Sequence, residues 1–197
     1  MPTLTTQLEA VNSMLGHIGE SPVDSIATPS ALPISASTAL TILDEVSREV
    51  QSDGWHFNTE YDVTLSPNAS NNIVLASDII EADVDDHSSD IVCRGLTLFN
   101  RKDNTSTFTS DIKVTLTRLL AWDSLPEPAR RYITLRAARI LQGRIVGSRE
   151  LEALIARDEY TAKARLEEFD SKNADRTIFD NFDTGARIGI NRNYSIT

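Results

Sequence analysis

The sequence has little cysteine, few aromatic residues and no long apolar segment. A single cysteine, Cys93, among 197 residues excludes an internal disulfide and a cysteine-rich metal site. The apolar runs are far shorter than the roughly 20 residues of a membrane-spanning helix, and the start of the sequence shows no basic segment followed by an apolar one. We therefore expect neither membrane insertion nor secretion.

Signatures of common catalytic and cofactor sites are also missing. The three histidines are far apart and fit no spaced metal motif, and no nucleophile elbow, phosphate loop or dinucleotide fingerprint is present. Cys93 lies in an apolar segment, which favours a core position over a nucleophile. We therefore expect no enzyme, no cofactor and no metal. The remaining enzymatic alternative is a carbohydrate-active protein that hydrolyses polysaccharide with two carboxylates, drawn from Glu60, Asp62, Glu81, Asp83, Asp85 and Asp86.

Positive charge is scarce and unevenly placed. The 29 acidic and 19 basic residues give a net charge of −10, which argues against binding of DNA phosphates across the surface. Arginines gather between residues 130 and 149, whereas acids gather between residues 78 and 90, which we interpret as an acidic loop. Such regions suit pairing with copies of the chain or with oppositely charged partners, or they are simply solvated surfaces. The candidate interface residues are Arg130, Arg136, Arg139, Arg144, Asp83, Asp85 and Asp86.

Four segments have the three-and-four apolar spacing of helices. They cover about residues 5–18, 35–53, 128–146 and 148–169. Thr5 or Thr6 is expected to cap the first helix and a serine the second, and Gly19 and three prolines predict a loop between them. In the third helix we expect the arginines to face outward. The fourth has a predicted buried stripe of Leu151, Leu154, Ile155, Ala162 and Leu166.

Between the second and third helices the pattern changes to that of strands. Alternating residues predict short strands at 55–65, 72–76, 90–94, 96–100 and 111–118, in the order of an antiparallel meander. Gly54 lies where the helical pattern ends and the strand pattern begins. We therefore interpret Gly54, Trp55 and Phe57 as a structural junction.

These patterns predict an α+β protein with a bundle of about four helices and an inserted antiparallel β domain. The expected boundaries are 1–54 and 119–170 for the helical body, 55–118 for the β domain and 171–197 for a C-terminal arm. The arm is polar but carries apolar residues, so we expect it to order against another subunit or a partner rather than stay disordered. Its candidate contact residues are Phe179, Phe182 and Tyr194.

Several short segments, taken in order, resemble the tail tubular protein A family of short-tailed bacteriophages. They are Leu8-Glu9-Ala10-Val11-Asn12, Ile18-Gly19-Glu20-Ser21-Pro22-Val23, Gly54-Trp55-His56-Phe57-Asn58, Ile91-Val92-Cys93-Arg94-Gly95, Leu98-Phe99-Asn100 and Leu125-Pro126-Glu127. The resemblance spans residues 8 to about 169. The loop at 24–38 and the chain after Phe169 match no motif of the family.

The resemblance implies a structural protein of the virion tail, assembled in the host cytoplasm. Members of this family are head-to-tail adaptors, or gatekeepers, built from a helical bundle with a β-rich domain. A dodecameric ring would connect the portal protein to the tail nozzle (tail tubular protein B). Genomic DNA would pass through it during ejection without specific binding.

Overall fold

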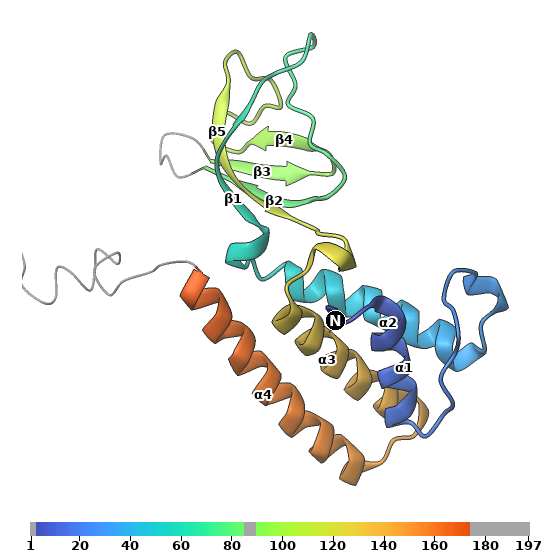
Figure 1. Ribbon diagram of the computed structural model, residues 1–197. Helices are drawn as coiled ribbons and strands as arrows, with labels where there is room; N and C mark the ends of the chain where they lie inside the picture. The colour runs from blue at the N-terminus through green and yellow to red at the C-terminus, as the bar shows by residue number, and fades with distance from the viewer. Residues whose placement is uncertain (1–2, 85–89, 174–197) are drawn as a thin grey trace, which may run out of the picture.

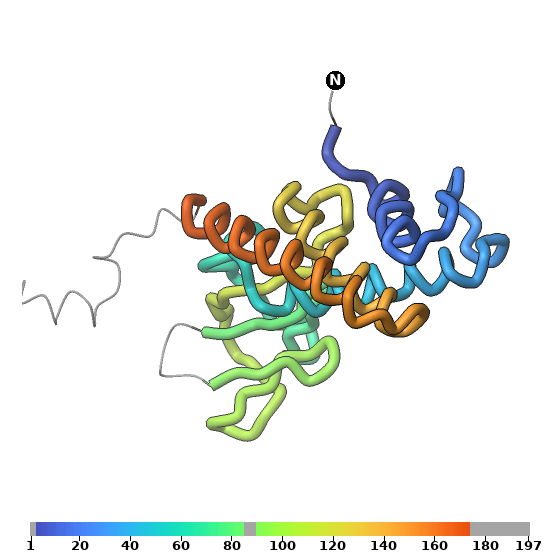
Figure 2. Tube along the Cα trace, turned by 90° about the horizontal axis from the view of Figure 1, so that it is seen from below, coloured from blue at the N-terminus to red at the C-terminus, as the bar shows by residue number. Residues whose placement is uncertain are grey.

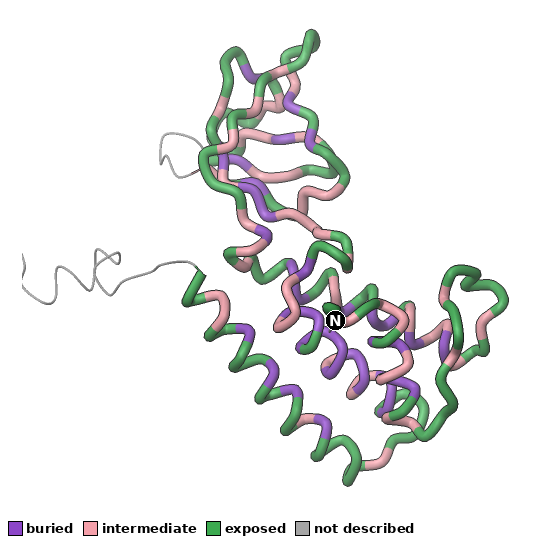
Figure 3. The backbone as a smooth tube through the Cα atoms, viewed as in Figure 1, coloured by how far each residue is buried: buried purple, intermediate pink, exposed green. Residues whose placement is uncertain are grey.

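Apolar residues at helical spacing build the lower body in Figure 1, a bundle of four helices beneath an antiparallel β domain. The computed structural model describes residues 3–84 and 90–173. Each body has its own buried core, and Figure 3 shows buried segments in both. The predicted α+β class with about four helices is confirmed.

The first helix, α1 (Gln7–His17), begins and ends with local hydrogen bonds that its sequence encodes. Thr6 caps it, since its hydroxyl accepts from the Glu9 amide while the Glu9 carboxylate accepts from the Thr6 amide. Gly19 follows the helix with a φ of 77°, and the Glu20 amide donates to the Leu15 carbonyl at 3.0 Å. The chain then runs through a loop with one short 3-10 turn, η1 (Pro29–Ala31).

The second helix, α2 (Ile34–Gln51), buries the predicted face but lacks the predicted cap. Its N-cap is Pro33, which has no side-chain acceptor, so the serine cap expected from the sequence is wrong. The Ser35 hydroxyl instead donates to the Glu20 carboxylate, which joins the helix start to the preceding loop. The buried face includes Ala39, Leu43, Val46 and Val50.

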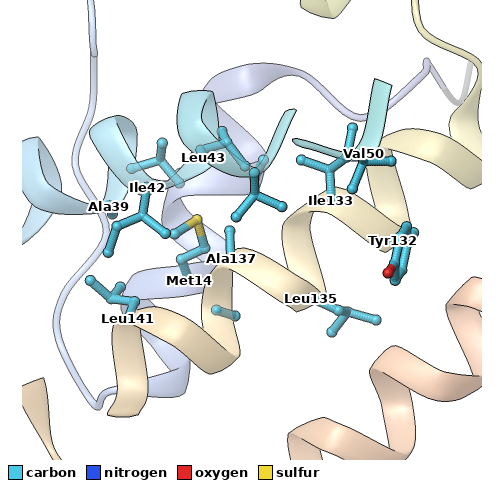
Figure 4. Close-up of a cluster of buried hydrophobic side chains, with 14 of the residues drawn as sticks. Met14, Ala39, Ile42, Leu43, Val50, Tyr132, Ile133, Leu135, Ala137 and Leu141 are labelled. Atoms are coloured by element: carbon cyan, nitrogen blue, oxygen red, sulfur yellow. The ribbon is translucent and has the colours of Figure 1, made fainter. Parts of the chain in front are cut away.

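The bundle core forms where α1 and α2 pack on α3 (Glu127–Ile145). Met14 reaches from α1 into the space between α2 and α3, among Ile42, Leu43 and Ala137 (Figure 4). A buried Leu or Met side chain of this kind contributes several kcal/mol, because its loss leaves a cavity. The same core also includes Ala162 and Leu166 of α4, so it joins all four helices of the described chain.

The fourth helix, α4 (Arg149–Asn173), packs along α3 at one side of the bundle (Figures 1 and 2). Ile155, Ala162 and Leu166 are buried against α3. The sequence prediction is wrong for Leu151 and Leu154, which are 39% and 65% exposed. Leu154 points about 100° away from Ile155 around the helix, so it lies outside a stripe that contacts a single neighbour.

The larger sheet has the order β1 (Thr59–Leu65), β5 (Ile112–Arg118), β2 (Ile79–Asp83), so the predicted meander is wrong. All pairs are antiparallel, but the last strand lies in the middle. The first strand starts at Thr59, because His56–Asn58 form a 3-10 turn, η2. Its expected alternation also fails at a bulge beside Asp62 (φ 55°), where Tyr61 is 53% exposed.

The smaller sheet is the hairpin of β3 (Ile91–Arg94) and β4 (Thr97–Asn100), close to the predicted bounds. The predicted strand at 72–76 forms only isolated bridges, such as Val74 with Thr97. The sequence pattern does not predict strand β2, because its residues fall within the 78–90 segment that we interpret from the sequence as an acidic loop. The β core comprises Ile73, Leu75, Ala82, Ile91, Leu98, Phe108, Val114 and Leu116.

Candidate functional site

The junction between the two bodies is built around Gly54 and Trp55. Gly54 has a φ of 70°, a left-handed conformation that favours glycine, and it lies beside the Thr117 hydroxyl of β5. The Trp55 indole donates to the Val50 carbonyl at 2.6 Å and stacks on Phe57, with ring centroids 6.4 Å apart. Both rings pack against the bundle core, which attaches the end of α2 to the start of the β domain.

Two buried amides, which sequence reasoning missed, join the two chain segments that cross this junction. Asn58 donates to the carbonyls of Gln51 and Arg118, both at 2.8 Å, and accepts from the Trp55 amide at 2.8 Å. Gln51 pairs with the backbone of Leu120, donating to its carbonyl and accepting from its amide. The available signal in the sequence was the position of Gln51 and Asn58 on either side of Gly54 and Trp55. An amide buried at such a junction needs hydrogen-bond partners, so it can join the segments that supply them.

Arg130 is a buried clamp, and the expectation that it faces outward is wrong. It is 3% exposed, and its guanidinium donates to three backbone carbonyls, those of Thr5, Asp123 and Leu125, at 2.8–2.9 Å. Asp123 lies in the 3-10 turn η3 (Trp122–Ser124). The side chain therefore fastens the chain before α1 and the turn before α3 onto one helix.

Arg136 and Arg139 lie half-buried between helices instead of pointing freely outward. Arg136 holds Glu49 of α2 through two nitrogens, at 2.6 and 3.3 Å, and its hydrogen bond to that carboxylate raises the pKa of Arg136 above its usual range. Both arginines also contact Glu159 of α4. These four residues form an ion-pair belt across α2, α3 and α4. Their role in binding a partner stays a prediction.

Glu159→Ala is expected to lower the free energy of unfolding by about 1–2 kcal/mol, because it leaves two guanidiniums without their shared carboxylate. This expected loss of free energy already includes a reduction for solvent screening, since the Arg136 and Arg139 side chains are 27% and 34% exposed. Urea unfolding followed by circular dichroism measures it. Glu152→Ala is the matched control, because Glu152 is half-exposed and 3.8 Å from Arg139. Equal small effects in both variants would contradict a stabilising belt.

The remaining candidate residues are dispersed. Arg144 is exposed near Glu45 at 3.7 Å, and Asp83 ends the edge strand β2. Asp85, Asp86, Phe179, Phe182 and Tyr194 lie outside the described residues. The structure therefore brings together Arg136 and Arg139, but not Arg130 or Arg144.

The carboxylates considered for polysaccharide hydrolysis differ in their exposure and in their ion pairs. Glu60 pairs with Arg118 at 2.9 Å, and the same guanidinium pairs with Asp78 across the sheet, a brace that sequence reasoning missed. Asp62 lies on the exposed surface, 3.8 Å from Lys113. Glu81 and Asp83 are exposed on β2. Glu81 and Asp83 line one pocket together, Asp85 and Asp86 lie outside the described residues, and the carboxylate pair stays a prediction.

Cys93 lies in β3, partly buried against the β core. Desolvation by burial raises the pKa of its thiol, which reduces its thiolate content at neutral pH. Within residues 3–84 and 90–173, no group of three or more potential metal ligands is present. No helix in these two ranges has the length and apolar character needed to cross a membrane.

Two comparisons with known proteins bear on this arrangement of bundle and β domain. A search of curated proteins finds no match. The family model described as tail tubular protein matches residues 8–176, which include all four helices except the first residue of α1 and all five strands of the described parts. The chain therefore belongs to the tail tubular protein family and is a structural component of a bacteriophage tail.

Proposed function

We propose that this chain is the ring-forming adaptor between the portal and the tail nozzle, with twelve copies around the channel through which the genome leaves. The observation that carries the proposal is the family match across both the bundle and the β domain. A two-body subunit offers separate surfaces for neighbouring copies and for proteins above and below the ring. The buried junction supports this role, because it fixes one body relative to the other.

The charge of the chain supports passage of DNA without binding. At −10 per copy, a ring of twelve carries roughly −120. Acidic groups facing a channel repel phosphates, so DNA slides without forming the ion pairs that cause salt-sensitive binding. The portal and the nozzle are therefore the specific partners in this proposal, and DNA is not.

Electron microscopy of the purified chain mixed with the purified portal tests this proposal. We expect a ring of twelve copies stacked coaxially on the portal. The chain alone at the same concentration shows whether the ring needs the portal as a template. Separate portals and free chain at micromolar concentration, with no added ring density, would contradict the adaptor function.

A further inference from the structure

Two arginines from neighbouring helices line a pocket on the side of the bundle. Arg131 of α3 and Arg165 of α4 border a cavity of about 290 Å³, together with Glu127, Pro128 and Ala162. Both arginines are exposed, unlike Arg130 beside them. The cavity lies near the start of α3, where the helix dipole also favours negative charge.

The two guanidiniums have donors available for an external anion. Across residues 3–84 and 90–173, neither has a carboxylate within 4 Å, whereas Arg136, Arg139 and Arg144 all do. Glu127, the acid in the pocket wall, already accepts from the amide and hydroxyl of Thr5 at 2.8 and 2.5 Å. Glu168 lies near Arg165 but pairs with Lys172 at 2.6 Å. The pocket is therefore a cationic site that the described chain leaves unfilled.

The β domain carries a pocket of the opposite sign. A cavity of about 600 Å³ beside β2 and β3 is lined by three exposed carboxylates, those of Glu81, Asp83 and Asp90, against one cation, Arg101, and it reaches Ser52 at the end of α2. Asp90 has a weak ion pair with Arg101, 3.6 Å apart and more than half exposed on both sides. Asp83 accepts only from the neighbouring Val84 amide, and Glu81 has no ion pair in the described parts of the chain. Within residues 3–84 and 90–173, two carboxylates therefore remain available at this edge.

We propose that these pockets are the two halves of one contact between neighbouring copies of the chain. Arg131 and Arg165 of one copy bind the carboxylates of Glu81 and Asp83 of the next, since a guanidinium and a carboxylate form paired, charge-assisted hydrogen bonds. One pocket is lined by α3 and α4 and the other mainly by β2 and β3, elements that lie in the two different bodies of Figure 1. A contact between two different surfaces is heterologous, the type that closes into a ring. The inference rests on the proposed ring.

Charge reversal tests the contact. One variant carries Arg131→Glu and Arg165→Glu, and a second carries Glu81→Lys and Asp83→Lys. Each alone should assemble with the portal at least about tenfold more weakly than the original chain, because like charges face each other at every contact. An equimolar mixture of the two should restore rings, since alternating copies again pair opposite charges. The quadruple variant should also restore them. Mass photometry and electron microscopy measure assembly, and circular dichroism checks folding.

The control variant reverses Arg149 and Arg157, which are exposed elsewhere on α4, and should assemble normally. Normal rings from both reversed variants would overturn this contact while leaving the adaptor function intact. Loss of rings without rescue in the mixture would assign the pockets to the portal or nozzle and overturn pairing between copies. Failure of the original chain to form rings would overturn the proposed function and this contact with it.

Discussion

Arg130→Ala is expected to lower the free energy of unfolding by about 3–5 kcal/mol. The substitution removes the three hydrogen bonds that the guanidinium of Arg130, a residue only 3% exposed, donates to the carbonyls of Thr5, Asp123 and Leu125. The chain before α1 should also be held less firmly to α3, because Thr5 loses the bond from Arg130 and keeps those to Glu127 of α3 and from Trp122. Urea unfolding gives the total change, and hydrogen exchange at the α1 amides gives its location.

The neighbouring residue provides the matched control for this variant. Arg131→Ala removes the same side chain from an exposed position and should change stability by less than about 0.5 kcal/mol. If Arg130 served a partner instead of the fold, its variant would unfold like the original chain and lose only assembly. That outcome would reject the clamp.

Asn58→Asp is expected to cost about 3–5 kcal/mol at neutral pH, although the side chain keeps its shape. The amide nitrogen of Asn58 donates to the carbonyls of Gln51 and Arg118, both 2.8 Å away, in a site that is 2% exposed. A carboxylate would place a negative oxygen against those two carbonyl oxygens. The variant should therefore separate the β domain from the bundle, as measured by limited proteolysis and urea unfolding.

The pH dependence of this variant provides a further check. Burial beside carbonyls raises the pKa of the introduced carboxyl above its unfolded value, so the folded state binds the proton more tightly. The stability deficit should therefore be smallest at acidic pH and grow as the pH rises through the folded pKa. Asn68→Asp is the control, because the structure uses only the side-chain oxygen of Asn68, which accepts from the amides of Ser70 and Asn72. A deficit independent of pH would point to steric causes.

The sequence predicted the helices well because their signals are local. The Thr6 cap, the glycines after α1 and α3 and the regular apolar stripes lie within a few residues of the features they determine. The strand β2 could not be found in the same way. Glu81 and Asp83 resemble loop residues, and only the pairing of β2 with β5 makes them part of a strand.

The candidate residues were harder to place than the elements that carry them. Helical spacing put Arg130 among the other arginines of α3, whereas one of its three carbonyl acceptors comes from Thr5, a residue far away in the sequence. Similarly, Arg131 gave no signal of its own. Its pocket arises only because Arg165 lies opposite on α4. Such pairings depend on tertiary packing, which residue spacing within one helix does not encode.

The junction has a mechanical consequence. The chain crosses between the bodies twice, and Asn58 and Gln51 bond the outgoing segment to the returning one. A third link is the amide of His56, which donates to Asp170 near the end of α4 at 2.7 Å. A single flexible linker would let the β domain rotate relative to the bundle. The bonds made by Asn58, Gln51 and His56 attach it at three points of the junction and so resist both bending and torsion. A load applied to the β domain is therefore transmitted to α2, α3 and α4 as a rotation of the whole subunit.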